Sequence, residues 1–277
     1  MNYAGDTRRA IIDTHIHLDQ YDKKGQQTII RYLERPDSEL TNVISVSMDL
    51  VSSINNMKLA ETHCGIHPAV GYHPEQKPPS DDVLQELFSF MQINKEKMIA
   101  IGEVGLPFYL REKDPSLQIK PYIEALELFI GKAKAWNKPI VLHAVYEDAD
   151  IVCDLLEKYS VRKAHFHWFK GSVSTLERMI RNGYYVSVTP DCVYEPEIKT
   201  LIEHYPIEQM MVETDGPWPF SGPFENNRTH PKMIHSSIAM IASLKNLDSL
   251  DVYQQIYDNT KRFYFPVMDS KTLLTPH

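Results

Sequence analysis

Residues 10–19 of this chain read AIIDTHIHLD, an apolar run that ends in two histidines spaced two residues apart. Side chains two apart in an extended strand face the same side, so His15 and His17 can reach one cation together. The same pattern also fits two hydrogen-bonded histidines at a strand end. Asp13 and Asp19 are candidates either to orient the two imidazoles or to cap the neighbouring turns.

Further runs of this kind recur along the chain. Each is short, rich in β-branched or aromatic residues, and bounded by Pro, Gly or charged residues, which is typical of buried strands. With residues 10–16, the candidate strands are NVISVSM (42–48), PAVGYH (68–73), MIAIGEV (98–104), PIVLHA (139–144), KAHFHWF (163–169), GYYVSV (183–188) and QMMVETD (209–215).

Helical periodicity fills most of the segments between these strands. Apolar residues recur there at i, i+3 and i+4, over residues 81–94, 116–136, 148–159, 174–182, 195–205, 232–246 and 248–263. Strands that alternate with helices indicate a parallel sheet, and a (β/α)8 TIM-like barrel is the simplest way to close it. A doubly wound open sheet is the alternative, although no glycine-rich phosphate loop follows any candidate strand.

The length of 277 residues allows one large α/β barrel domain over residues 1–277, which we expect, or two small domains. The chain is 43% hydrophobic and has no internal repeat or linker-like segment. The first ten residues lack the apolar stretch of a signal peptide, and no run approaches the roughly 20 apolar residues that span a bilayer. We therefore expect no membrane association. Cys64, Cys153 and Cys192 are far apart and odd in number, which indicates reduced thiols in a cytoplasmic protein.

The net charge of −8 argues against a protein that coats nucleic-acid duplex through counterion release. It leaves open an enzyme that admits a phosphate end into a pocket where metal ions supply the positive charge.

The candidate active-site residues share one feature, which is their position where an apolar run ends. The carboxyl ends of barrel strands form the mouth where TIM-barrel enzymes act. Imidazoles and carboxylates from five strands at one mouth are typical of a metal-assisted hydrolase. The residues are His15, His17, Glu103, His143, His167, Glu213 and Asp215.

Glu103 follows the apolar residues 98–101, so its carboxylate must be paired, solvated or metal-bound. A carboxylate can bridge two ions about 3.5–4 Å apart, and a structural ion pair is the alternative. His143, taken alone, fits a hydrogen-bonded core histidine equally well. The same holds for His165 and His167, of which only one need be a ligand.

Glu213 and Asp215 share a strand face just before Gly216-Pro217, which forces a turn. Asp215 can bind a metal and accept a proton from water whose pKa the metal lowers, or it can simply form that turn. Glu213 is better placed to orient a neighbouring ligand.

His73 and Arg228 are the candidate substrate contacts. His73 ends a candidate strand and is preferred over His67, which no strand-like run precedes; a turn histidine is the alternative. Arg228, in the loop 218–231, can pair with a phosphate or carboxylate of a substrate, or remain solvated.

Taken in the order in which they occur along the chain, the motifs resemble those of the TatD-like metal-dependent deoxyribonucleases, a branch of the amidohydrolase-type barrels. The resemblance runs nearly end to end and rests on DTHIHLD, GYHP, AIGEVGL, KPIVLHA, HFHWFKGS, VETDGPWPF and NTKRFYF. The chain departs from the family pattern at Pro107, where Asp is usual, at Ala144-Val145 in place of Ser-Arg, and at Lys170 in place of a small residue.

The resemblance implies a role for each motif. It implies that His15, His17 and Asp215 hold one divalent ion, and that Glu103 bridges to a second ion. His143 and His167 would hold that second ion. The expected ions are Mg, Mn or Zn, and the expected reaction is hydrolysis of DNA phosphodiester bonds, often from the 3′ end, with Asp215 and Glu103 as the catalytic residues.

The expected substrate is thus a DNA end or a small phosphodiester. The three departures surround the substrate rather than the ions, and they favour one alternative: an amidohydrolase-type enzyme that acts on a C–N, ester or lactone bond. A non-catalytic barrel that serves as an interaction protein is the remaining alternative, which the complete ligand set opposes.

Overall fold

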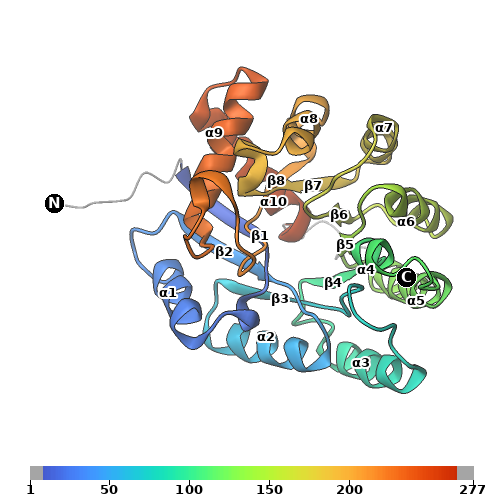
Figure 1. The fold of residues 1–277 in the computed structure, drawn as a ribbon. Helices are drawn as coiled ribbons and strands as arrows, with labels where there is room; N and C mark the ends of the chain where they lie inside the picture. The colour runs from blue at the N-terminus through green and yellow to red at the C-terminus, as the bar shows by residue number, and fades with distance from the viewer. Residues whose placement is uncertain (1–8, 267–277) are drawn as a thin grey trace, which may run out of the picture.

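The computed structural model describes residues 9–266, in which each candidate strand overlaps an observed strand. The strands are all parallel and pair in sequence order, as the (β/α)8 barrel requires (Figure 1). They are β1 (Ile11–Ile16), β2 (Leu40–Ser45), β3 (Ile66–Val70), β4 (Ala100–Gly105), β5 (Ile140–His143), β6 (Ala164–Phe166), β7 (Tyr185–Val188) and β8 (Met210–Val212). The predicted barrel is confirmed, and the open sheet is excluded.

The two ends of the strand order meet just beyond β8. The backbone N–H of Asp215 donates to the carbonyl of His15 at 2.8 Å, and the N–H of His17 donates to the carbonyl of Gly216 at 2.7 Å. The carboxylate of Asp13 accepts from the backbone N–H of Thr214 at 3.0 Å. These bonds join β1 to the segment after β8, so both predicted site segments are fixed to each other through the backbone.

Most of the helices surround the strands on the outside of the barrel, whereas α10 (Ser249–Tyr264) lies behind the ring of strands in the view of Figure 1. The helices are α1 (Lys23–Leu33), α2 (Leu50–Thr62), α3 (Asp81–Asn94), α4 (Phe108–Lys113), α5 (Lys120–Trp136), α6 (Glu147–Lys158), α7 (Val173–Asn182), α8 (Pro196–His204), α9 (Ile234–Lys245) and α10. Several begin at a side-chain cap: Ser172 accepts from the N–H of Thr175 before α7, and Asp49 accepts from that of Ser52 before α2.

Three of these helices, α1, α2 and α4, were not predicted. In α2 the buried face is itself polar, because the amide of Asn56 donates to the carbonyl of Val46 and the hydroxyl of Ser47. Ser45 donates to the same amide's oxygen at 2.7 Å. A helix that packs through hydrogen bonds shows no apolar period, and that period was the signal used to find helices.

Apolar side chains pack in two places. The larger cluster lies between the strands and the helices, and a smaller one joins strand residues to the last turn of α10. In the smaller cluster Phe263 and Tyr264 pack with Ile44, Val141 and Met211.

The remaining sequence expectations concern the chain as a whole. Cys64, Cys153 and Cys192 are free thiols. Between residues 9 and 266 we find no helix with both the length and the apolar character needed to cross a membrane. The prediction that the chain lacks a signal peptide rests on its first ten residues, and residues 1–8 lie outside the described residues.

Candidate metal centre

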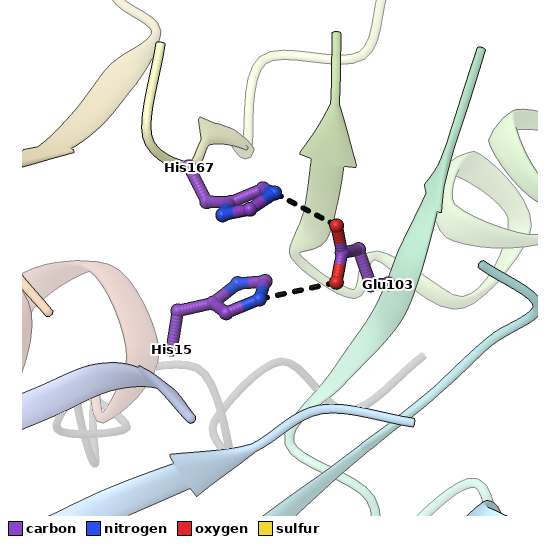
Figure 2. Close-up of side chains that lie close together, drawn as sticks. All are labelled: His15, Glu103 and His167. Carbon is purple, nitrogen blue, oxygen red and sulfur yellow. Dashed lines mark ion pairs between the residues drawn. The ribbon is translucent and has the colours of Figure 1, made fainter. Parts of the chain in front are cut away.

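Strand ends bring the predicted histidines and carboxylates together around Glu103. Glu103 lies within β4, His143 ends β5, and His17 and His167 each follow a strand by one residue. All of these side chains are buried. The two oxygens of the Glu103 carboxylate face different partners: Oε2 lies 3.1 Å from His15 Nε2, and Oε1 lies 2.7 Å from His167 Nε2 (Figure 2).

The first group, His15, His17 and Asp215, surrounds Oε2 of Glu103. The Nε2 atom of His17 is 3.2 Å from this oxygen, and Asp215 Oδ1 lies 3.3 Å from His15 Nε2 and 3.4 Å from His17 Nε2. Atoms that each lie about 2.0–2.2 Å from one ion in tetrahedral or octahedral coordination are roughly 2.8–3.5 Å apart. The spacing of the first group fits a divalent ion.

The hydrogen bonding of the first group supports the same fit. Within residues 9–266, His15 Nε2, Glu103 Oε2 and Asp215 Oδ1 are buried and have no hydrogen-bond partner. Buried polar atoms are almost always satisfied, so three converging unsatisfied ones need an explanation. A shared cation satisfies all three.

The second group, His143 and His167, surrounds Oε1 of Glu103. His143 Nδ1 lies 3.0 Å from this oxygen and 3.2 Å from His167 Nε2. The spacing again matches donors around one ion. The ring of His167 stacks on that of His15 with centroids 3.8 Å apart, so the two groups lie directly side by side on Glu103.

The imidazoles of the two groups change the pKa values of the carboxylates that they face. Burial would raise the pKa of Glu103, but the nearby His167, His73 and His15 hold it well below the usual value. Burial would likewise raise the pKa of Asp215, but the nearby imidazoles of His15 and His17 lower it. Both carboxylates are therefore ionised at neutral pH and present negative charge to the space between the imidazoles.

A carboxylate lies behind each histidine of the second group. Glu75 is within hydrogen-bond distance of His143 and so fixes which of its ring nitrogens points at Glu103, whereas His167 Nδ1 has no hydrogen-bond partner within residues 9–266. Glu75 Oε1 lies 3.3 Å from His143 Nε2, and Glu213 Oε1 lies 3.6 Å from His167 Nδ1. A carboxylate at one ring nitrogen keeps the proton there and leaves the other nitrogen free to bind a metal. Glu213 is itself held, because the N–H of Trp168 donates to it at 2.8 Å.

Glu75 was not predicted as a site residue. Its carboxylate accepts from the backbone N–H groups of Tyr109 and Leu110 at 2.9 and 2.8 Å, which fixes it against the start of α4. The only signal in the sequence was its place two residues after His73. Its partner His143 is remote in the chain, so local spacing could not reveal the pair.

His73, the predicted substrate contact, lies beside the second group. Its Nε2 is 3.3 Å from Glu103 Oε1, and the backbone N–H of Glu75 donates to its Nδ1 at 3.1 Å. Burial lowers the pKa of His73, so the ring is neutral and its single proton is on Nε2. A protonated nitrogen cannot bind a cation, but it can donate a hydrogen bond to an anionic oxygen.

Two other residues lie elsewhere. The guanidinium of Arg228 binds Asp22 through two hydrogen bonds, of 2.6 and 2.7 Å. None of the Arg228 hydrogen bonds or ion pairs found in residues 9–266 involves the histidines or Glu103, so its substrate contact stays a prediction. His165 hydrogen-bonds Tyr264 and Ser187 instead of facing Glu103, which agrees with the preference for His167.

The three departures from the expected family pattern lie at the mouth. Pro107 directly precedes α4, and Val145 is buried after β5. The Nζ atom of Lys170 lies 5.9 Å from the ring centroid of Trp168.

Comparison with known proteins agrees with this geometry. Residues 12–265 match the family described as TatD related DNase. The chain is 36% identical to an uncharacterized metal-dependent hydrolase of Haemophilus influenzae, over 92% of this chain and 99% of that protein. It is 25% identical to human deoxyribonuclease TATDN3, over 92% of this chain and 94% of that protein.

A solved structure shows the same fold. It is that of YjjV, a TatD homologue from Escherichia coli K12, with a TM-score of 0.76 and 22% identity, and the match covers 93% of this chain and 98% of that one.

Proposed function

Since this chain belongs to the family of TatD-related DNases and is a metal-dependent hydrolase, we propose that it hydrolyses a phosphodiester bond at a DNA end with two divalent ions held on either side of Glu103. One observation carries the proposal: each oxygen of the Glu103 carboxylate faces its own set of donors at metal-ligand spacing. Human deoxyribonuclease TATDN3, similar over nearly the whole chain, supports DNA as the substrate.

Each group has a proposed ligand set. His15, His17 and Asp215 would hold one ion with Oε2 of Glu103, and His143 and His167 would hold the other with Oε1. Imidazole donors suit Zn²⁺, and carboxylates also suit Mn²⁺ and Mg²⁺, so we rank the ions in that order. When bound, such a pair of ions supplies Lewis-acid chemistry, polarising the phosphoryl oxygens and lowering the pKa of water.

Asp215 would act as the proton acceptor. Its lowered pKa keeps the carboxylate ionised, so it can take a proton as the water oxygen bonds to phosphorus. The P–O bond to the leaving alcohol then breaks, and that oxygen takes up a proton from solvent. His73 would donate its Nε2 proton in a hydrogen bond to a phosphoryl oxygen. Glu213 and Glu75 would keep His167 and His143 in the ligand tautomer.

The test combines metal analysis with parallel assays. Wild-type protein should contain two ions per chain and shorten a single-stranded oligonucleotide labelled at its 5′ end. Chelation should abolish the activity, and added Zn²⁺, Mn²⁺ or Mg²⁺ should restore it. Amide, ester and lactone substrates, assayed beside the DNA, should remain intact.

Two variants complete this test. Glu103→Ala should lose both the ions and the activity, whereas Glu112→Gln, on the exposed side of α4, should keep both. Full cleavage of DNA by the Glu103→Ala protein would refute the proposal. Hydrolysis of the amide or lactone substrates alone would refute DNA as the substrate while leaving the metal centre in place.

A further inference from the structure

The geometry points to a base-stacking site at the mouth of the barrel, in which Trp218 and Tyr109 hold the bases on either side of the phosphodiester that is cut. This inference rests on the proposed function and adds to it how the substrate is held. The two rings would bind the planar faces of nucleobases, whereas the metal centre would bind the phosphodiester.

Exposure singles out the two rings. Eight large hydrophobic side chains are exposed within residues 9–266, and six of them are aliphatic: Val51, Val83, Ile93, Leu128, Val173 and Leu247. The two aromatic ones are Trp218, which is 42% exposed, and Tyr109, which is 37% exposed. Aromatic side chains gain free energy from burial, and both of these exposed rings lie beside the metal centre.

Each ring lies next to one group of ligands. The ring centroid of Trp218 is 6.0 Å from that of His17, at an interplanar angle of 62°. The ring centroid of Tyr109 is 6.1 Å from that of His143, at 67°. One aromatic ring thus lies beside the first group and the other beside the second.

The topology places the two rings across the mouth from each other. Trp218 lies in the loop after β8, and Tyr109 lies in α4, after β4. In a ring of eight strands that pair in sequence order, β4 and β8 are diametrically opposed. Figure 1 shows α4 and the segment after β8 on opposite sides of the ring of strands. A phosphodiester bound over Glu103 therefore has an aromatic surface on each side.

Both rings are fixed through their backbones to residues of the centre. The N–H of Trp218 donates to the carbonyl of Asp215 at 3.3 Å, and the N–H of Tyr109 donates to Glu75 at 2.9 Å. Burial raises the pKa of Tyr109 to about 12, so its ring stays a neutral phenol. A backbone that is already fixed in this way loses little conformational entropy when a ligand binds.

Charge at the mouth favours stacking over backbone recognition. The chain has a net charge of −8, Arg111 is paired with Asp148, and Arg228 is held away from the centre by Asp22, while Lys170 lies over the ring of Trp168. Stacking on an aromatic side chain contributes about 1–3 kcal/mol per base and tolerates any sequence. Binding should therefore depend little on base sequence and only weakly on salt.

The experiment compares one oligonucleotide with versions that carry an abasic residue on one or both sides of the terminal linkage. Trp218→Ala and Tyr109→Ala should each raise KM for the normal oligonucleotide about 5- to 160-fold, the range that stacking energies imply, with kcat nearly unchanged. On the doubly abasic substrate, both variants should match the wild type. Trp218→Phe and Tyr109→Phe should restore most of the affinity.

A binding measurement gives a readout without turnover. Fluorescence anisotropy with an oligonucleotide whose terminal linkage is a non-hydrolysable phosphonate should show the same losses. Ile93→Ala, a change at an exposed aliphatic residue of α3, should leave both KM and anisotropy unchanged. Metal content and melting temperature should be equal in all variants.

Two outcomes would overturn the inference by itself. One is wild-type affinity in both alanine variants, and the other is equal loss on normal and abasic substrates, because that loss would come from the metal centre. Failure of the wild-type protein to cut any oligonucleotide is a different result, which would overturn the proposed function and this inference with it.

Discussion

The two groups of ligands on Glu103 are built in different ways. In the first group both imidazoles come from one strand, and backbone hydrogen bonds of 2.8 and 2.7 Å join that strand to the segment of Asp215. In the second group the imidazoles of His143 and His167 come from two strands. Each has a carboxylate behind it, Glu75 or Glu213, that belongs to a remote part of the chain.

This difference indicates how each group can change. The barrel backbone positions the first group, so only loss of a ligand itself should empty it. Single side chains behind the histidines position the second group, so changes outside the ligand set should weaken it. We therefore expect the second ion to be the weaker and the more easily tuned of the two.

Replacement of Glu103 should have the largest effect, because this carboxylate belongs to both groups. Glu103→Gln keeps the shape of the side chain but removes the charge that faces five imidazoles, those of His15, His17, His73, His143 and His167. We expect both ions to be lost and kcat/KM to fall at least about a thousandfold. Metal analysis after gel filtration measures the first effect. A variant that retained one tightly bound ion would show that the groups do not share Glu103 equally.

Replacement of Asp215 should remove the ion of the first group and leave the ion of the second group bound. Asp215→Asn removes one ligand of the first group and the proposed proton acceptor, so we expect one ion per chain and a decrease in kcat of about 10²- to 10⁴-fold. Asp22→Asn removes the charge that pairs with Arg228 and leaves an amide oxygen that can still cap α1, so it is the matched control. Loss of both ions in Asp215→Asn would contradict the independence of the second group.

Glu75→Gln should weaken the second ion alone. The amide still fills the space but no longer attracts a proton to Nε2 of His143, so Nδ1 becomes a poorer ligand. We expect about 10- to 100-fold weaker binding of the second ion and unchanged binding of the first. Titration calorimetry resolves the two steps, and the ¹⁵N chemical shifts of His143 report its tautomer. Equal weakening of the two binding steps would show that Glu75 affects both ion sites and not His143 alone.

The same difference explains how much of the centre the sequence could predict. His15 and His17 are two residues apart on one strand, so the period of a strand brings them together before any tertiary structure is known. Glu103 and Asp215 follow apolar runs, which marks them as strand-end acids. For His143 and His167 the residues alone left core histidines open, and the resemblance to a family selected them as ligands.

What the sequence could not predict depends on tertiary contacts. Glu75 acts on His143 only because α4 holds its carboxylate with two backbone N–H groups. The tautomer of His73 depends on the N–H of Glu75, which is a property of the folded turn. The eight strands were predicted because each is a distinct apolar run, whereas α2 was missed because its buried Asn56 and Ser52 interrupt the apolar period.

The effect of pH should be the smallest for a change of one pH unit, and it should arise in the metal-free protein. Burial alone would lower the pKa of His17, but the nearby carboxylates of Asp215 and Glu103 raise it to about 9. The pKa values of His143 and His167 are also raised by their carboxylate partners, against burial. Without ions, protons on these imidazoles balance the charge of the carboxylates, and each ion must displace them.

The sign of the pH effect follows from this exchange. A raised pKa in the folded protein stabilises it fully below the unfolded value of about 6.5, and the stabilisation is lost as pH rises through about 9. Metal affinity should change in the opposite direction, increasing up to about tenfold per pH unit for each proton released. The increase in melting temperature on adding Zn²⁺ should therefore grow from pH 6.5 to 9. His204→Gln, at the end of α8, should leave that slope unchanged, and a slope of zero in the wild-type protein would show that protons and ions do not compete at Glu103.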